Sequence, residues 1–125
     1  MENFSLDATK HTPAVSIDYN QGLIEIRGRA QLKDVQTFYE SVSKAIPYFV
    51  NHLSKIFISV HLSWFNSAGI RAVYLILNEF HRLQRQGVQI EIQWQYQIDD
   101  VNAMEVGKDL QQLTSLNFSL NPIAS

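Results

Sequence analysis

Residues 88–97, Val-Gln-Ile-Glu-Ile-Gln-Trp-Gln-Tyr-Gln, alternate strictly between apolar and polar side chains. A period of two is typical of a β-strand that has one face in the core and the other in water. Strands of a purely parallel sheet, which is covered on both faces, are continuous apolar runs instead. The segment therefore predicts a sheet with helices on one side only and a largely polar opposite side.

The segments around this strand continue the pattern in both directions. Residues 68–86 carry apolar side chains at a helical spacing of 3.6, and Gly87 is placed to end that helix with a positive φ. Before the helix, residues 56–64 alternate again, which predicts a second strand. After the first strand, Asp99-Asp100 opens a further predicted helix. The expected apolar positions of that helix are Val101, Met104, Leu110 and Leu113.

The remaining parts of the chain complete the order of elements. The expected elements are strands at 15–19, 23–29 and 116–120, and a helix from Asp34 to about Leu53. Gly22 suits the turn between the strands at 15–19 and 23–29. Pro47 should interrupt the helix near Ile46. The resulting order, β-β-α-β-α-β-α-β, predicts an α/β two-layer sandwich. Its mixed sheet should have about five strands, with the helices on one face.

Length and composition limit the classes of protein to consider. The 125 residues, 46% of them hydrophobic and 18% charged, suit a single domain over residues 1–125. A net charge of −2 argues against a general nucleic-acid binder. The absence of cysteine excludes disulfides and thiolate chemistry. The chain has no apolar run of about 20 residues and no signal-peptide pattern at its start. We therefore expect a cytoplasmic protein that binds neither nucleic acid nor membrane.

Motifs for catalysis, metals or cofactors are weak. The five glycines do not cluster into a phosphate-binding loop, and the four histidines, at 11, 52, 61 and 81, are scattered. We therefore expect no catalytic residue, no metal site and no cofactor, and hence no enzyme. One alternative of that class remains, a small-molecule enzyme or ligand carrier that uses Asp99, Asp100 and His61.

The junction from Trp64 to Arg71, between the strand at 56–64 and the helix at 68–86, has the most distinctive chemistry. The alternation places Trp64 on the inward face of its strand and turns Phe65 elsewhere. Asn66 or Ser67 is a natural helix N-cap. A phosphate on Ser67 would add about 1.5 to 2 negative charges where backbone N–H groups accept an anion. Residue chemistry alone does not distinguish a capping serine from a phosphorylation site.

The chain resembles two families at this junction. The order of elements and the Asn66–Ile70 segment are similar to the STAS domain of anti-sigma-factor antagonists, in which a serine at the start of a helix is phosphorylated. A closer resemblance, to the SiaC family of regulatory phosphoproteins, covers nearly the whole chain. The matching stretches are Thr9–Val15, Gly22–Arg29, Trp64–Gly69, the helix that ends at Gly87, and the strand with Trp94 and Tyr96.

The SiaC resemblance implies a partner-switching adaptor with a STAS-like fold. A Ser/Thr kinase would phosphorylate the chain and a PP2C-type phosphatase would reset it. The unphosphorylated form would bind and activate a diguanylate cyclase and so raise cyclic di-GMP and promote biofilm formation or aggregation. The position that matches the family's phosphoacceptor is Ser67. The expected partner-binding residues are Trp64, Phe65, Asn66, Gly69 and Arg71.

The chain departs from the family pattern at three positions. Ser67 stands where the family usually has threonine, and Ala68 and Gly69 replace two hydroxyl residues. In the STAS register the phosphorylated position would be Ala68, which has no hydroxyl, and this favours the SiaC register. An anti-sigma-factor antagonist that regulates a sigma-factor pathway remains the alternative function.

Overall fold

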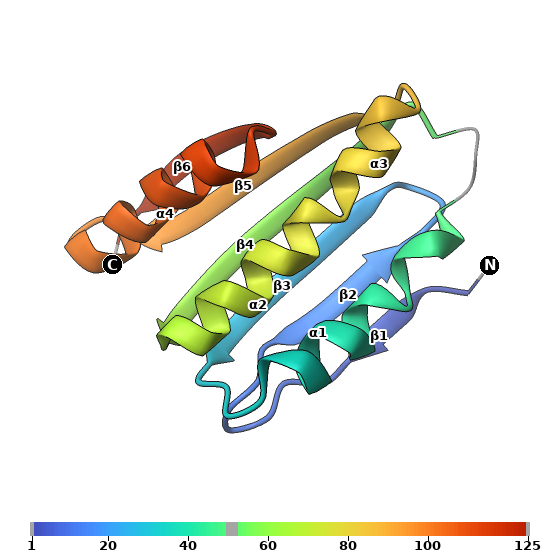
Figure 1. Cartoon of the computed structure of the whole chain (residues 1–125). Helices are drawn as coiled ribbons and strands as arrows, with labels where there is room; N and C mark the ends of the chain where they lie inside the picture. Colours follow the sequence, from blue (N-terminus) through green and yellow to red (C-terminus); the bar gives the residue numbers. More distant parts are fainter. Residues whose placement is uncertain (1, 50–52, 125) are drawn as a thin grey trace.

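The structure is a computed structural model that describes residues 2–49 and 53–124. It contains a six-stranded sheet with the helices packed on one face (Figure 1). In chain order the elements are β1 (Phe4–Leu6), β2 (Ala14–Asp18), β3 (Leu23–Ala30), α1 (Val35–Ser43), the 3-10 helix η1 (Ile46–Tyr48), β4 (Lys55–Phe65), α2 (Ser67–Asn78), α3 (Phe80–Arg85), β5 (Gln89–Gln97), α4 (Val101–Thr114) and β6 (Asn117–Ile123). The predicted two-layer α/β sandwich is confirmed.

The strands lie side by side in chain order. The pairs β1–β2 and β2–β3 are antiparallel, whereas β3, β4, β5 and β6 are parallel to one another. Each parallel pair is joined by a helical crossover, and crossovers of one hand that always step in one direction leave their helices on one face. Accordingly, α1 covers the antiparallel part, α2 and α3 cover the centre, and α4 covers β5 and β6 (Figure 1).

The alternating residues of the strands build the core as expected. Ile90, Ile92 and Trp94 of β5 are buried under the helices, and the intervening glutamines of that strand lie on the uncovered face. The same alternation buries Ile24 and Ile26 of β3. Burial of these apolar side chains stabilises the fold by roughly 25 cal/mol for each Å² removed from water.

Two differences from the expectation concern strand number and the first helix. A short strand, β1, adds a sixth strand at the antiparallel edge. The helix capped by Asp34 ends at Ser43 and not near Leu53, and Pro47 sits in the 3-10 turn that follows. The interruption itself was predicted correctly. Its cause is that proline lacks a backbone donor and does not fit an α-helix interior. Residues 50–52 of the expected helix lie outside the described residues.

The helix expected over residues 68–86 is divided at Glu79 into α2 and α3. The Glu79 N–H donates to the carbonyl of Ile76, a bond one residue shorter than the α-helical pattern, at 3.1 Å. The apolar stripe nevertheless continues, since Leu77 and Phe80 on either side of the division are both buried. Gly87 follows with a φ of 98°, as its expected role at the helix end requires.

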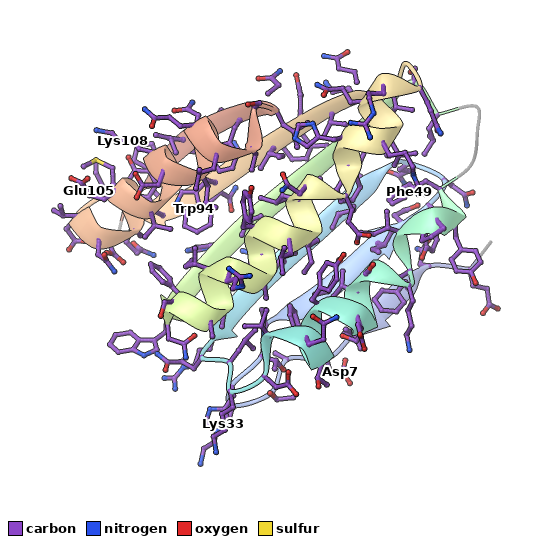
Figure 2. All side chains as sticks on the ribbon, viewed as in Figure 1. Asp7, Lys33, Phe49, Trp94, Glu105 and Lys108 are labelled. Carbon is purple, nitrogen blue, oxygen red and sulfur yellow. The ribbon has the colours of Figure 1, made fainter. Side chains whose placement is uncertain are left out.

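The buried face of α4 differs from the expected one. Val101 and Leu113 are 63% and 62% exposed, so these two of the four expected apolar positions do not face the core. The helix packs through the small residues Ala103 and Gly107, through Thr114, and through Leu110, an expected position that is buried. Gly107 is needed there because a Cβ would lie 2.5 Å from Cδ1 of Trp94. Figure 2 shows Trp94 between α4 and the sheet, where its indole N–H donates to the Ala103 carbonyl at 2.9 Å.

Candidate functional site

A β-bulge determines which way the aromatic side chains at the end of β4 point. Gly28 of β3 pairs with Leu62 of β4, but the next residue, Arg29, pairs with Trp64, so Ser63 is an extra residue. An inserted residue reverses the alternation beyond it. Gly28 has a φ of 119° at this irregularity, a conformation that other residues rarely adopt.

Trp64 therefore points outward and not into the core as the alternation predicted. Its side chain is 61% exposed. The neighbouring Phe65 turns inward and packs edge-to-face against Trp94, with ring centroids 6.4 Å apart. The two rings have exchanged their expected positions because of the single extra residue in the strand.

Asn66 connects the end of β3 to the start of α2. Its Oδ1 caps the helix by accepting from Gly69 N at 2.8 Å and also accepts from Leu32 N at 3.2 Å. Its Nδ2 donates to the Leu32 carbonyl at 3.0 Å. An amide is suited to this position because it presents a donor and an acceptor at once. The cap of α2 is thus Asn66, which leaves the Ser67 side chain without a capping role.

Gly69 brings the helix into direct contact with the end of β3. The residue is buried, and a Cβ there would lie 1.9 Å from the Ala30 carbonyl oxygen. No side chain fits into that space, so glycine is required by packing and not by φ. The Asn66 N–H also donates to this carbonyl, at 3.2 Å. The first turn of α2 is therefore held firmly against the sheet.

Ser67 and Arg71 lie on the accessible side of this fixed turn. Ser67 is the first residue of α2 and is exposed, and Arg71 is exposed one helical turn later. The N-terminus of a helix carries a partial positive charge, which stabilises an added negative group. The serine hydroxyl is thus presented where a modifying enzyme can reach it and where the helix tolerates a phosphate.

The six residues of the expected switch and partner site therefore divide into two sets. The structure brings Trp64, Ser67 and Arg71 to the surface. It turns Phe65, Asn66 and Gly69 into the fold, where they pack, cap and make room for the backbone. A role for any of them in binding a partner stays a prediction.

The loop before β2 lies beside Trp64, a neighbour that the alternation alone does not indicate. Thr9 and Thr12 close this loop with a hydroxyl–hydroxyl hydrogen bond of 2.7 Å. The Gln31 N–H donates to the His11 carbonyl at 2.9 Å and so ties the loop to the residues after β3. The loop contains the threonine-proline stretch that resembles the SiaC family, and this stretch was the only feature of the sequence that drew attention to the loop.

Asp100 and His61, two residues of the alternative enzyme hypothesis, lie in different parts of the fold. Asp100 caps α4 by accepting from Ala103 N at 3.0 Å. His61 lies on the sheet face opposite the helices, between the buried Val60 and Leu62. Partial burial, and then the nearby positive charge of Arg27, lower the pKa of His61. Within residues 2–49 and 53–124, no three His, Asp or Glu side chains are grouped to hold a metal ion.

The family model of the SiaC family regulatory phosphoproteins matches residues 6–123. The chain therefore belongs to the SiaC family. No curated protein matches the chain. In the described part of the chain, no helix combines the length and the apolar character needed to cross a membrane.

Solved structures have the same fold. The crystal structure of apo-SiaC from Pseudomonas aeruginosa is 20% identical, with a TM-score of 0.82 over 97% of this chain and 99% of that one. SiaC from the same organism, in the crystal structure of the diguanylate cyclase SiaD in complex with its activator SiaC, is 17% identical. It has a TM-score of 0.83 over 96% of this chain and 99% of that one. At these identities the likeness shows the fold.

Proposed function

We propose that the chain is a phosphorylation-controlled adaptor whose unphosphorylated form binds and activates a diguanylate cyclase. Membership of a family of regulatory phosphoproteins supports the regulatory role. A structural relative that is described as the activator of the cyclase SiaD supports the kind of partner. Activation raises cyclic di-GMP and thereby promotes biofilm formation or aggregation. The adaptor acts by binding, as a single regulatory domain in the cytoplasm, and has no catalytic step of its own.

The observation that carries this proposal is the placement of Ser67. Its hydroxyl is exposed on the first residue of α2, and Asn66 supplies the cap that the serine would otherwise provide. A Ser/Thr kinase can therefore modify the hydroxyl without removing a bond that the fold needs. A PP2C-type phosphatase restores the free hydroxyl.

A phosphate at this position changes the surface and preserves the fold. It adds about 1.5 to 2 negative charges at neutral pH, and the positive end of the α2 dipole accepts them. Arg71, one helical turn later, is spaced to pair with the phosphate across the helix surface. The local charge next to Trp64 therefore changes sign while the backbone stays in place, which allows one partner to be exchanged for another.

Binding experiments with Ser67 variants test the proposal. Purified diguanylate cyclases of the source organism are assayed one by one against the immobilised chain, and cyclic di-GMP production is followed in parallel. We expect Ser67→Ala to bind and activate one cyclase as the wild type does, and Ser67→Asp to lose both properties. Ser54→Asp, which makes the same change at an exposed serine next to the opposite end of β4, is the matched control.

Two outcomes would overturn the proposal. Equal binding by Ser67→Ala and Ser67→Asp would remove the switch, provided that both variants melt like the wild type. Binding of a purified anti-sigma kinase in the same assay, with no binding of any cyclase, would select the anti-sigma-factor antagonist function.

A further inference from the structure

A groove beside the proposed switch has a composition that defines a ligand class. The pocket has a volume of 310 Å³ and is lined by Lys10, His11, Arg29, Gln31 and Trp64. We propose that this groove binds an acidic segment of the partner cyclase, with an apolar side chain of that segment packed on the Trp64 indole. The inference rests on the proposed function and names the surface and the chemistry by which that partner is recognised.

The exposure of Trp64 is the first support for the groove as a binding surface. Trp64 is 61% exposed, although the strand alternation would have buried its side chain without the extra residue in β4. Phe65 already fills the inward place against Trp94, so the fold does not need the outward ring. Tryptophan and arginine are enriched among the residues that dominate binding at protein interfaces. An interface at Trp64 would bury apolar surface that the free chain leaves in water.

The charges of the groove determine the sign of its partner. Its lining has two permanent cations, Lys10 and Arg29, and no carboxylate. Among the described residues the ion pairs are Arg27–Glu25 and Lys55–Glu91, so neither cation of the groove is paired within the chain. This positive patch occurs on a chain with a net charge of −2. Complementary charge steers association and fixes orientation, which points to a segment rich in Asp and Glu.

Nearby carboxylates do not neutralise the groove. Asp7 and Asp34 line a different pocket, between the loop before β2 and the start of α1. Figure 2 shows Asp7 and Lys33 at this end of the molecule. The Asp34 carboxylate is engaged in capping α1, where it accepts from Thr37 N at 3.2 Å and from the Thr37 hydroxyl at 2.7 Å. The groove thus keeps its positive character.

The backbone that carries the groove residues is held in place before a partner arrives. The Gln31–His11 bond and the Thr9–Thr12 pair hold the loop, and the bulge holds the backbone of Trp64. Preorganised surfaces lose less conformational entropy on binding than mobile ones. The groove can therefore bind a short segment without first being ordered.

The residue before the proposed phosphoserine is tied by hydrogen bonds to the chain segment that carries the groove. Asn66, which precedes Ser67, is hydrogen-bonded to Ala30 and Leu32, the residues on either side of Gln31. A phosphoserine at position 67 would add negative charge near the end of β3, which carries Arg29, and would repel an incoming acidic segment. Phosphorylation would thus release the cyclase by electrostatics, with no change of fold.

Binding of the purified cyclase to groove variants tests the inference. We expect Trp64→Ala to weaken binding at least about thirtyfold, as for residues that dominate an interface, and Arg29→Glu to weaken it about tenfold. Tyr48→Ala and Arg85→Glu make the same kinds of change near the opposite end of the fold and should shift binding less than twofold. Raising the salt from 50 to 200 mM should weaken binding of the wild type more than that of Arg29→Glu.

The results separate this inference from the proposed function. If the wild type binds a cyclase and Ser67→Asp does not, but both groove variants bind like the wild type, the groove is not the docking site. If no cyclase binds the wild type, the proposed function fails and this inference falls with it. Binding of a single-stranded oligonucleotide that the groove variants abolish would assign the groove to nucleic acid and overturn the inference. In a double-mutant cycle, Ser67→Asp should weaken cyclase binding by a smaller factor in the Arg29→Glu variant than in the wild type.

Discussion

Asn66→Ala removes the side chain that joins the end of β3 to the start of α2. The helix loses its N-cap, which costs about 1 kcal/mol. The two hydrogen bonds to the Leu32 backbone, at 3.2 and 3.0 Å, cost about 1 kcal/mol each because the N–H and the carbonyl of the buried Leu32 are left unpaired. We therefore expect the free energy of unfolding to fall by about 3 kcal/mol. For a domain of this length the melting temperature should fall by about 10 °C.

A second variant separates the two contributions. Asn66→Asp keeps the Oδ1 acceptor for Gly69 and Leu32 but loses the donor to the Leu32 carbonyl, and its charge is favoured at a helix N-terminus. We expect a loss of about 1 kcal/mol for this variant. Asn102→Ala, at an exposed position of α4, is the matched control and should change the stability by less than about 0.5 kcal/mol.

Urea unfolding followed by far-ultraviolet circular dichroism measures these differences. We expect the wild type to be the most stable, Asn66→Asp to be intermediate and Asn66→Ala to be the least stable. An Asn66→Ala variant within about 0.5 kcal/mol of the wild type would refute the role assigned to this side chain.

Three further predictions concern buried or partly buried positions. Gly69→Ala should cost about 3 kcal/mol or more in a urea melt, because the new Cβ collides with the Ala30 carbonyl. His61→Gln should reduce the loss of stability on acidification. Burial, and then Arg27, lower the folded pKa of His61 below its usual 6.5, so the unfolded chain binds more protons and stability falls as the pH drops through 6.5. If the urea midpoint changes by the same amount between pH 7.5 and pH 5.5 in His61→Gln and in the wild type, this expectation is wrong. Tyr19→Phe should cost about 1–2 kcal/mol, since its hydroxyl donates to a buried carbonyl 2.5 Å away, and an unchanged thermal melt would disprove that bond.

The strand alternation was sufficient to predict the layers of this fold. A period of two in β3, β4 and β5 identifies the buried face, and polar residues on the other face indicate that helices cover one side only. The short edge strand β1 was missed because three residues, Phe4–Leu6, are too few to show a period. Its pairing with β2 depends on tertiary contact and not on a local pattern.

The positions of Trp64 and of the α4 core residues show where sequence patterns are insufficient. The bulge depends on how β3 and β4 align, which the sequence of β4 alone does not contain. In α4, residue size misled the prediction: the large Val101 and Leu113 face water, and Gly107 allows the helix to approach Trp94 closely. The small residues Ala103 and Gly107 therefore belong to the buried face together with Leu110, although neither has a large apolar side chain.

The exposed serine at the start of α2 was predicted in position, but its role depends on modification in the cell. Trypsin should release residues 56–71 as one peptide, since no Lys or Arg lies between Lys55 and Arg71. This peptide also contains Ser59 and Ser63, which serve as internal controls for locating a phosphate.

Site-resolved phosphopeptide mass spectrometry of this peptide, from cells of the source organism with and without the PP2C-type phosphatase, determines whether Ser67 is the regulated residue. We expect phosphate on Ser67 that accumulates when the phosphatase is missing, with Ser59 and Ser63 unmodified. A Ser67 that carries no phosphate in either strain, or a phosphate confined to Ser63, would contradict it.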